Sequence, residues 1–106
     1  MITYDDFKKI ELKTAKVVDV KDHPQADKLY ILTIDLGTEK KDIVAGIKNF
    51  YGPDELKGRN IVVVSNMEPA VIRGVESSAM LLAAQTKDAL SIITLDKEIP
   101  AGTAIK

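Results

Sequence analysis

The stretch LYILTIDLGTEKKDIVAGI, residues 29–47, decides the fold class. Apolar side chains occupy every second position from Tyr30 to Leu36, which is the period of a half-buried strand. The segment Gly37–Lys40 supplies a turn, and Asp42–Ile47 is a second apolar strand that pairs back on the first. This part of the chain therefore predicts an antiparallel hairpin.

Strands are also predicted on both sides of this hairpin. Before it, the β-branched run Thr14–Val20 forms a strand that ends at the polar loop Lys21–Lys28. After it, Tyr51–Gly58 has proline and two acids near its start and glycine at its end, which is typical of a single helical turn. The short apolar run Asn60–Asn66 then predicts a central strand.

The two ends of the chain add smaller elements. Thr3, with Asp6 three residues later, predicts a short N-terminal helix. A loop, Met67–Ser78, leads to a fifth strand at Ala79–Gln85, although alanine and leucine also favour helix there. Leu90–Leu95 forms a C-terminal β extension.

We therefore expect one all-β domain over residues 1–106, with the element order of a five-stranded oligonucleotide-binding (OB) barrel. Periodicity alone leaves other small β-barrels open. In an OB barrel the ligand crosses strands two and three and contacts the loops after strands one and four. These loops are Lys21–Lys28 and Met67–Ser78.

Composition narrows the function. The 106 residues include 15 basic and 16 acidic side chains, a net charge of −1, so any nucleic-acid site must be local. The chain has no cysteine and one histidine, which argues against thiolate zinc sites and other metal centres. The sequence has no strand–turn–helix motif carrying a nucleophilic serine and no phosphate-binding glycine loop, so we expect that the protein is not an enzyme. No signal peptide or membrane-spanning run is present, and a cytoplasmic location is the default expectation.

Three segments, residues 22–30, residues 43–47 with 51–58, and residues 66–84, together resemble the tRNA-binding domain family. This family occurs at the C-terminus of many methionyl-tRNA synthetases and as free-standing tRNA-binding proteins. The resemblance implies an OB fold, a homodimer, no cofactor, and an aminoacyl-tRNA synthetase as a candidate partner. It also implies non-catalytic binding to the outer elbow of tRNA, through shape and backbone with little reading of sequence.

The resemblance supplies the basic candidates for RNA binding. It places Lys28 at the RNA groove, and it places Lys13 and Lys16 on the first strand, where relatives usually carry a basic residue. Arg73 precedes Gly74, and its guanidinium can fork onto a phosphate. Each of these lysines has the alternative of being an ordinary solvated side chain.

Four further candidates have a structural alternative. His23 either stacks on a base or is a turn residue before proline. Asn66 either offers its amide at the groove edge or forms a turn. Ser77 either bonds to RNA or caps the loop, and Met80 either lines the groove or, as we expect, fills the core.

Two departures from the family pattern weaken the expected binding. Glu68 and Val71 stand where many relatives have lysine, so fewer phosphate contacts are available. A protein-interaction module of the same fold, chaperone-like or concerned with assembly, is therefore the alternative function. Four apolar residues near the termini are expected to cover a symmetric dimer seam instead of a client: Ile2, Phe7, Ile99 and Ile105.

Overall fold

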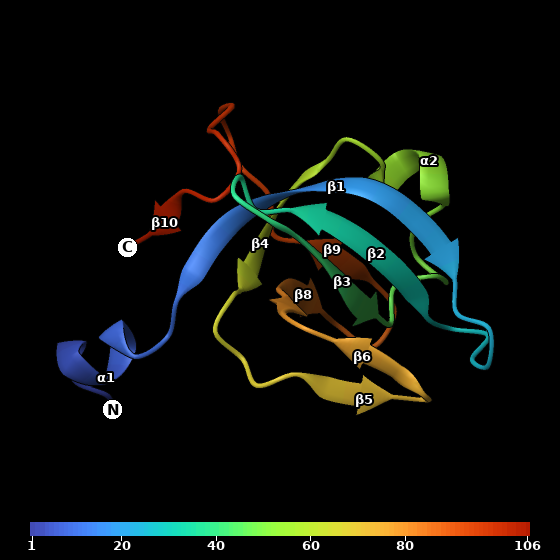
Figure 1. The fold of residues 1–106 in the computed structure, drawn as a ribbon, viewed down its shortest axis with the longest axis horizontal. Helices are drawn as coiled ribbons and strands as arrows, with labels where there is room; N and C mark the ends of the chain where they lie inside the picture. Colours follow the sequence, from blue (N-terminus) through green and yellow to red (C-terminus); the bar gives the residue numbers. More distant parts are fainter.

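The computed structural model describes all residues 1–106 and is built almost entirely of strands (Figure 1). The two helices are α1 (Tyr4–Lys8) and α2 (Pro53–Leu56). The strands of the barrel and its margin are β1 (Leu12–Asp22), β2 (Tyr30–Asp35), β3 (Lys40–Ala45), β4 (Asn60–Val64), β7 (Met80–Leu81) and β10 (Ala104–Ile105). Two small hairpins consist of β5 (Ala70–Ile72) with β6 (Val75–Ser77), and of β8 (Ala83–Gln85) with β9 (Leu90–Ile92). Neither helix has the length needed to span a bilayer.

β1 is the strand around which the sheet is organised. Its first residues pair with β4 on one side and with β10 on the other, and its second half pairs with β2. The register with β2 shifts between Val17 and Asp19. A bulge of this kind increases local twist and bends a strand, so β1 can belong to both halves of a curled sheet.

The sheet curls into a nearly closed barrel with the order β3-β2-β1-β4-β7. Its two end strands, β3 and β7, are joined by hydrogen bonds near β6 instead of by a regular ladder. The Val44 amide donates to Ser77 Oγ at 3.0 Å, and the Ser78 amide donates to the Asp42 carbonyl at 3.1 Å. The expected five-stranded OB barrel is thereby confirmed.

The core follows the alternation that the sequence shows. Leu32, Ile34 and Ile43, from the predicted hairpin, are fully buried and pack against Val17 and Ile61. Leu56 from α2 is also fully buried, so the predicted helical turn covers one end of the barrel. Burying one such side chain contributes about 1.5–3 kcal/mol relative to leaving it exposed.

The prediction of one continuous fifth strand at Ala79–Gln85 is wrong. Residues 79–85 form two short strands, β7 and β8, which are separated by Leu82. The Leu82 amide donates to Val62 of β4, whereas its carbonyl accepts from Ile93 beyond β9. The chain changes partner at this residue, because β7 completes the barrel while β8 forms a hairpin outside it.

The loop Met67–Ser78 also holds more structure than predicted. It contains the β5–β6 hairpin, whose turn consists of Arg73 (φ 52°) and Gly74 (φ 88°). Two successive positive φ values match a type I′ turn, whose twist fits a two-residue hairpin. The predicted N-terminal helix is confirmed, with the Thr3 and Asp6 capping box formed.

Candidate nucleic-acid interface

Lys28 and Arg73 lie together at one end of the barrel. They line a polar pocket of about 430 Å³ between the first loop and the β5–β6 hairpin, with Asp27 and the stretch around Gln25. Both cations are exposed, and neither has an acidic partner within 4 Å. Two unpaired cations at the mouth of one pocket can contact successive phosphates.

Arg73 is held in an uncommon backbone conformation at the tip of the hairpin. It is the only non-glycine residue with positive φ, and this conformation costs about 1–2 kcal/mol for a residue with a Cβ. Its Nη2 donates to the Gln25 carbonyl at 3.1 Å, which directs the guanidinium toward the first loop. An asparagine would adopt this turn at lower cost, so the arginine indicates a use for the guanidinium.

The buried His23 side chain joins the first loop to the β5–β6 hairpin by hydrogen bonds. Its ring is 5% exposed, and Nε2 lies 3.0 Å from the Ile72 carbonyl. The Gln25 amide donates to Nδ1 at 3.0 Å, so the neutral ring carries its proton on Nε2. Because both nitrogens bind the protein, His23 positions the first loop against the hairpin in this structure, and its ring is not presented to solvent.

The outward face of the barrel beside this pocket is not basic. On β2 and β3 it presents Asp35 and Asp42 together with the exposed Lys40 opposite Asp35, and Thr33 donates to Asp42 at 2.8 Å. Asp19 on the neighbouring part of β1 lies 3.9 Å from Lys57. A phosphate backbone lying across these strands would therefore meet as much negative as positive charge, and the loop edge is the more favourable contact.

Lys13 and Lys16 lie far from Lys28 and Arg73. They sit near the beginning of β1, an 11-residue strand, so about 30 Å of strand separates Lys13 from the first loop. Lys16 is 3.8 Å from Glu98 of the C-terminal segment. The predicted basic residues therefore do not form one continuous surface on a single barrel.

The remaining candidates take structural positions. The Asn66 amide group accepts from Glu11 N–H at 3.0 Å and donates to the Lys9 carbonyl at 2.8 Å, which ties the end of β4 to the segment after α1. Ser77 is buried, and its hydroxyl accepts from the Val44 amide and donates to the Ala79 carbonyl. Met80 is 44% exposed, so the expectation that it fills the core is wrong.

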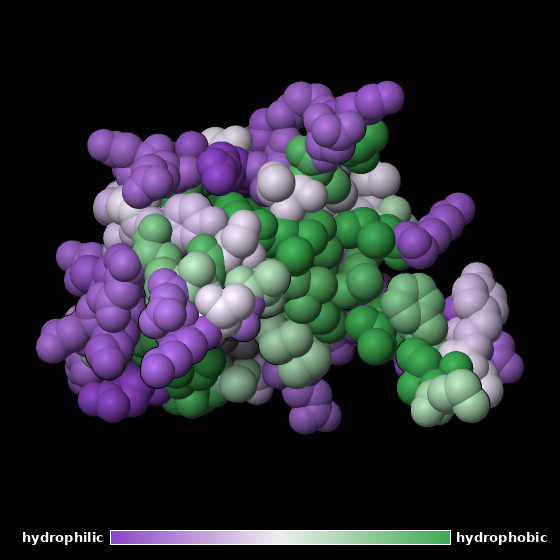
Figure 2. All heavy atoms as spheres, turned by 180° about the vertical axis from the view of Figure 1, so that it is seen from behind, coloured by the Kyte–Doolittle hydropathy of each residue, from purple (hydrophilic) through white to green (hydrophobic).

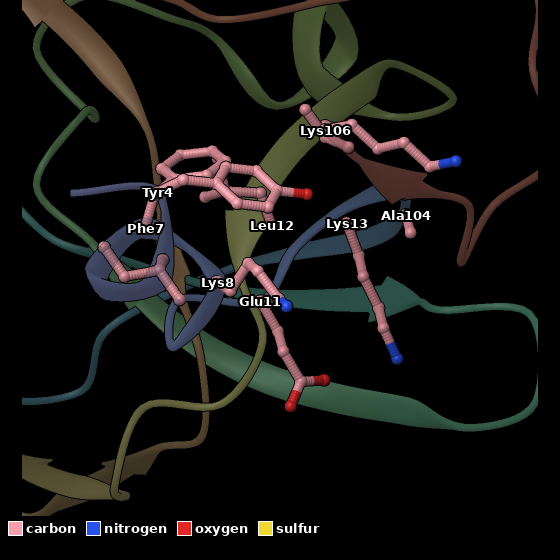
Figure 3. A pocket seen from close by; sticks show the side chains of 10 residues that line it. Tyr4, Phe7, Lys8, Glu11, Leu12, Lys13, Ala104 and Lys106 are labelled. Atoms are coloured by element: carbon pink, nitrogen blue, oxygen red, sulfur yellow. The ribbon is translucent and has the colours of Figure 1, made fainter.

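Lys13 borders a second cavity, between α1 and the C-terminal strand. This cavity has a volume of about 200 Å³, and its lining is mostly apolar. Tyr4 and Phe7 of α1 and Leu12 of β1 converge on it (Figure 3). Sequence reasoning placed Phe7 and Ile105 in an apolar seam, but it missed Tyr4 and Leu12, because the return of β10 beside β1 is a long-range pairing.

The barrel, with its cationic loop edge, defines the class of small OB-type ligand-binding modules. Within that class the chain belongs to the tRNA-binding domain family, because the family described as "Putative tRNA binding domain" matches residues 12–104. The chain is 51% identical over 104 residues, 98% of its length, to a methionine–tRNA ligase of Thermotoga maritima. It spans only 14% to 16% of the length of the ligases that it matches.

Solved structures agree with this assignment over the whole chain. A MetRS related protein from Pyrococcus horikoshii superposes with a TM-score of 0.93 at 33% identity, covering 100% of this chain and 98% of that one. A CsaA chaperone protein from Picrophilus torridus superposes with a TM-score of 0.91 at 36% identity, covering 100% of both chains. The expected family resemblance is confirmed, and both RNA-related and chaperone relatives share the fold.

Proposed function

We propose that this protein binds tRNA without catalysing a reaction, recognising backbone shape through the loop edge formed by Lys28 and Arg73. The observation that carries the proposal is Arg73, which stands in a costly conformation beside an unpaired lysine. Family membership supports tRNA as the ligand. The site of action is the cytoplasm, where an aminoacyl-tRNA synthetase is the natural partner.

Binding by one barrel is weak, because few cations are available at the site. Two phosphate contacts release few counterions, and acidic residues occupy the adjoining strand face. Glu68 and Val71 add no cation to the hairpin side of the site. Useful affinity therefore requires more than one barrel on each tRNA.

A homodimer supplies the second barrel. The apolar cavity beside α1 adjoins exposed hydrophobic side chains, including Tyr4 at 74% and Ile10 at 45% exposure. Hydrophobic surface extends from the centre of the back face toward α1 (Figure 2). A self-complementary contact through this seam would cover it and would place four loop cations on one assembly.

The test is a filter-binding titration with total tRNA, comparing the unmodified protein with the double variant Lys28→Ala and Arg73→Ala. We expect at least a tenfold loss of affinity, because each lost charge-assisted contact contributes about 1.5–3 kcal/mol. Lys87→Ala is the matched control, since Lys87 is an exposed cation on the turn between β8 and β9. Equal binding by the double variant and this control would remove Lys28 and Arg73 from the interface.

A second candidate function is binding of protein clients. It is favoured by exposed apolar residues around β5 and β7, namely Met67 at 47%, Val71 at 73% and Met80 at 44% exposure. Flexible methionine side chains suit surfaces that accept varied partners. The similarity to chaperone structures supports this candidate. Suppression of the aggregation of a denatured protein, at stoichiometric amounts, would test it.

A further inference from the structure

A small apolar pocket lies between the barrel and the β5–β6 hairpin. Val44 and Met80 line it from β3 and β7, and Ala70 and Ile72 line it from the hairpin, with Met67 beside them. Its volume is about 140 Å³. A dry apolar cavity of about 150 Å³ can hold benzene, so this pocket has room for one phenylalanine or leucine side chain.

The pocket continues into a neighbouring groove of about 300 Å³. Val44 and Met80 line both of them, and the groove extends along Ala45–Ile47 to Leu81 and Leu90. Met80, at the boundary, is 44% exposed. The groove therefore offers a second apolar contact to a ligand whose first side chain fills the pocket.

The charges beside this apolar surface are negative. Glu68 is the only ionisable residue that lines the pocket, and none lines the groove. Asp42 stands two residues before Val44 on β3, so its side chain lies on the same face of the strand. Both carboxylates are exposed, and neither has a cation within 4 Å. Lys40, the cation on that face of β3, lies opposite Asp35 and two residues further from the pocket.

This combination of shape and charge selects the kind of ligand. A phosphate backbone would find no cation in the lining and would be repelled by the carboxylates, so RNA is disfavoured. A ligand with an apolar side chain and adjacent positive charge satisfies both features of the surface. Lysine and arginine beside leucine or phenylalanine have this chemistry in a polypeptide.

We propose that the pocket and the groove bind a segment of a partner protein in which apolar side chains are flanked by lysine or arginine. The proposal gives a location and a partner chemistry to the protein-binding function described above, and it rests on that function. One apolar side chain fills the pocket between Met67 and Met80, whose flexible thioether side chains adapt to its shape. A flanking cation lies against Glu68 or Asp42.

The probe is a fluorescent peptide in which leucine and phenylalanine are flanked on each side by two lysines. Its binding to the full chain is followed by fluorescence anisotropy. One matched peptide has glutamate in place of every lysine, and another has serine in place of leucine and phenylalanine. Because the surface contributes both apolar contact and negative charge, we expect each matched peptide to bind at least tenfold more weakly than the probe.

The charge of the site is tested with Glu68→Lys and Glu76→Lys. Glu68→Lys replaces attraction by repulsion at the pocket, and we expect at least a tenfold loss of affinity for the probe. Glu76 follows the same hairpin, but its neighbour Ser77 lines the pocket, so alternation directs Glu76 to the opposite face. Glu76→Lys is therefore the matched control, and we expect less than a twofold change.

The apolar contact is tested with Met80→Gln and Met80→Leu. Glutamine has a similar length but adds polar groups, and we expect about a fivefold loss of affinity for the probe. Leucine keeps the apolar surface, so Met80→Leu should bind almost normally. Met80 is exposed, and both variants are expected to fold.

The outcomes separate the site from the function. Equal affinities of the Glu68→Lys and Glu76→Lys variants for the probe would overturn the site while leaving client binding intact. Failure to bind the probe, in a protein that still suppresses aggregation, would do the same, whereas failure in both assays would overturn client binding as well. If Glu68→Lys raised tRNA affinity more than Glu76→Lys and left peptide affinity unchanged, the pocket would belong to RNA, contrary to the proposal.

Discussion

Arg73 combines a backbone that favours asparagine or glycine with a side chain that can bind phosphate. Asn and Gly occupy positive φ at lower cost, whereas only arginine offers a planar fork of donors. The guanidinium also reaches the Gln25 carbonyl, so it is directed before any ligand arrives. Under the proposed function, arginine at this position favours phosphate binding at the expense of stability.

Arg73→Asn is expected to separate these two effects. Relief of the backbone conformation offsets the loss of the hydrogen bond to Gln25, so the free energy of unfolding should change by less than about 1 kcal/mol. Affinity for tRNA should fall about tenfold. Urea unfolding and filter binding give the two numbers, and a large loss of stability would show that the side chain acts mainly within the fold.

His23→Ala is expected to act chiefly on stability. It leaves the Ile72 carbonyl and the Gln25 amide without their partner, at a cost of about 1–3 kcal/mol in the free energy of unfolding. Chemical denaturation at neutral pH measures the change. A variant of normal stability that had lost tRNA binding would instead support a direct contact between the ring and RNA.

At the scale of elements, the C-terminal segment is held by close backbone contact with the β2–β3 turn. A Cβ on Gly102 would overlap the Leu36 carbonyl oxygen, and Gly102 has a φ of +85°. Thr14 adds hydrogen bonds to Pro100 and Thr103. β10, which follows this segment, forms one wall of the apolar cavity beside α1.

Gly102→Ala should therefore destabilise the protein by more than about 2 kcal/mol, because steric overlap adds to backbone strain. Gly58→Ala is the control, since Gly58 has a similar φ of +82° but open space around its Cβ position. It should cost only about 1 kcal/mol, from backbone strain alone. Thermal unfolding compares the two variants, and equal melting temperatures would contradict the close contact.

At the scale of the whole molecule, the proposed tRNA binding and the proposed dimer depend on each other, because cations are sparse at the site. Two contacts per barrel predict that log Kd changes with log salt with a slope of about 2 for a monomer and about 4 for a dimer. A double variant Tyr4→Glu and Phe7→Glu should disrupt the seam, giving a monomer and roughly half the slope. Sedimentation velocity and salt titration check both expectations.

The control for this experiment is Lys9→Glu, which changes charge beside the same helix at a side chain that is 78% exposed. It should leave the sedimentation coefficient unchanged. If the unmodified protein sediments as a single 11.6 kDa chain, the dimer proposal fails, and the full affinity must come from one barrel.

Local patterns in the sequence were sufficient for the first four strands of the barrel and for α2, whereas the family resemblance chose the OB barrel among small β-barrels. The alternation from Tyr30 to Leu36, the β-branched run at β4 and the proline–glycine frame of α2 each express a backbone preference that tertiary packing reinforces. Lys28 and Arg73 could also be proposed from the sequence, because both stand in loops. The sequence could not show that the chain changes strand partner at Leu82. Its amide donates to Val62 and its carbonyl accepts from Ile93, and both partners are distant in sequence.

Only the tertiary structure decided what each candidate side chain can do. The sequence by itself determined the family, the all-β class and the scarcity of positive charge. Folding consumed the polar groups of His23, Asn66 and Ser77 in internal hydrogen bonds, brought Arg73 beside Lys28, and left Met80 at an open groove. The physical reason is that exposure and hydrogen-bond partners depend on contacts between distant segments, which no local pattern encodes.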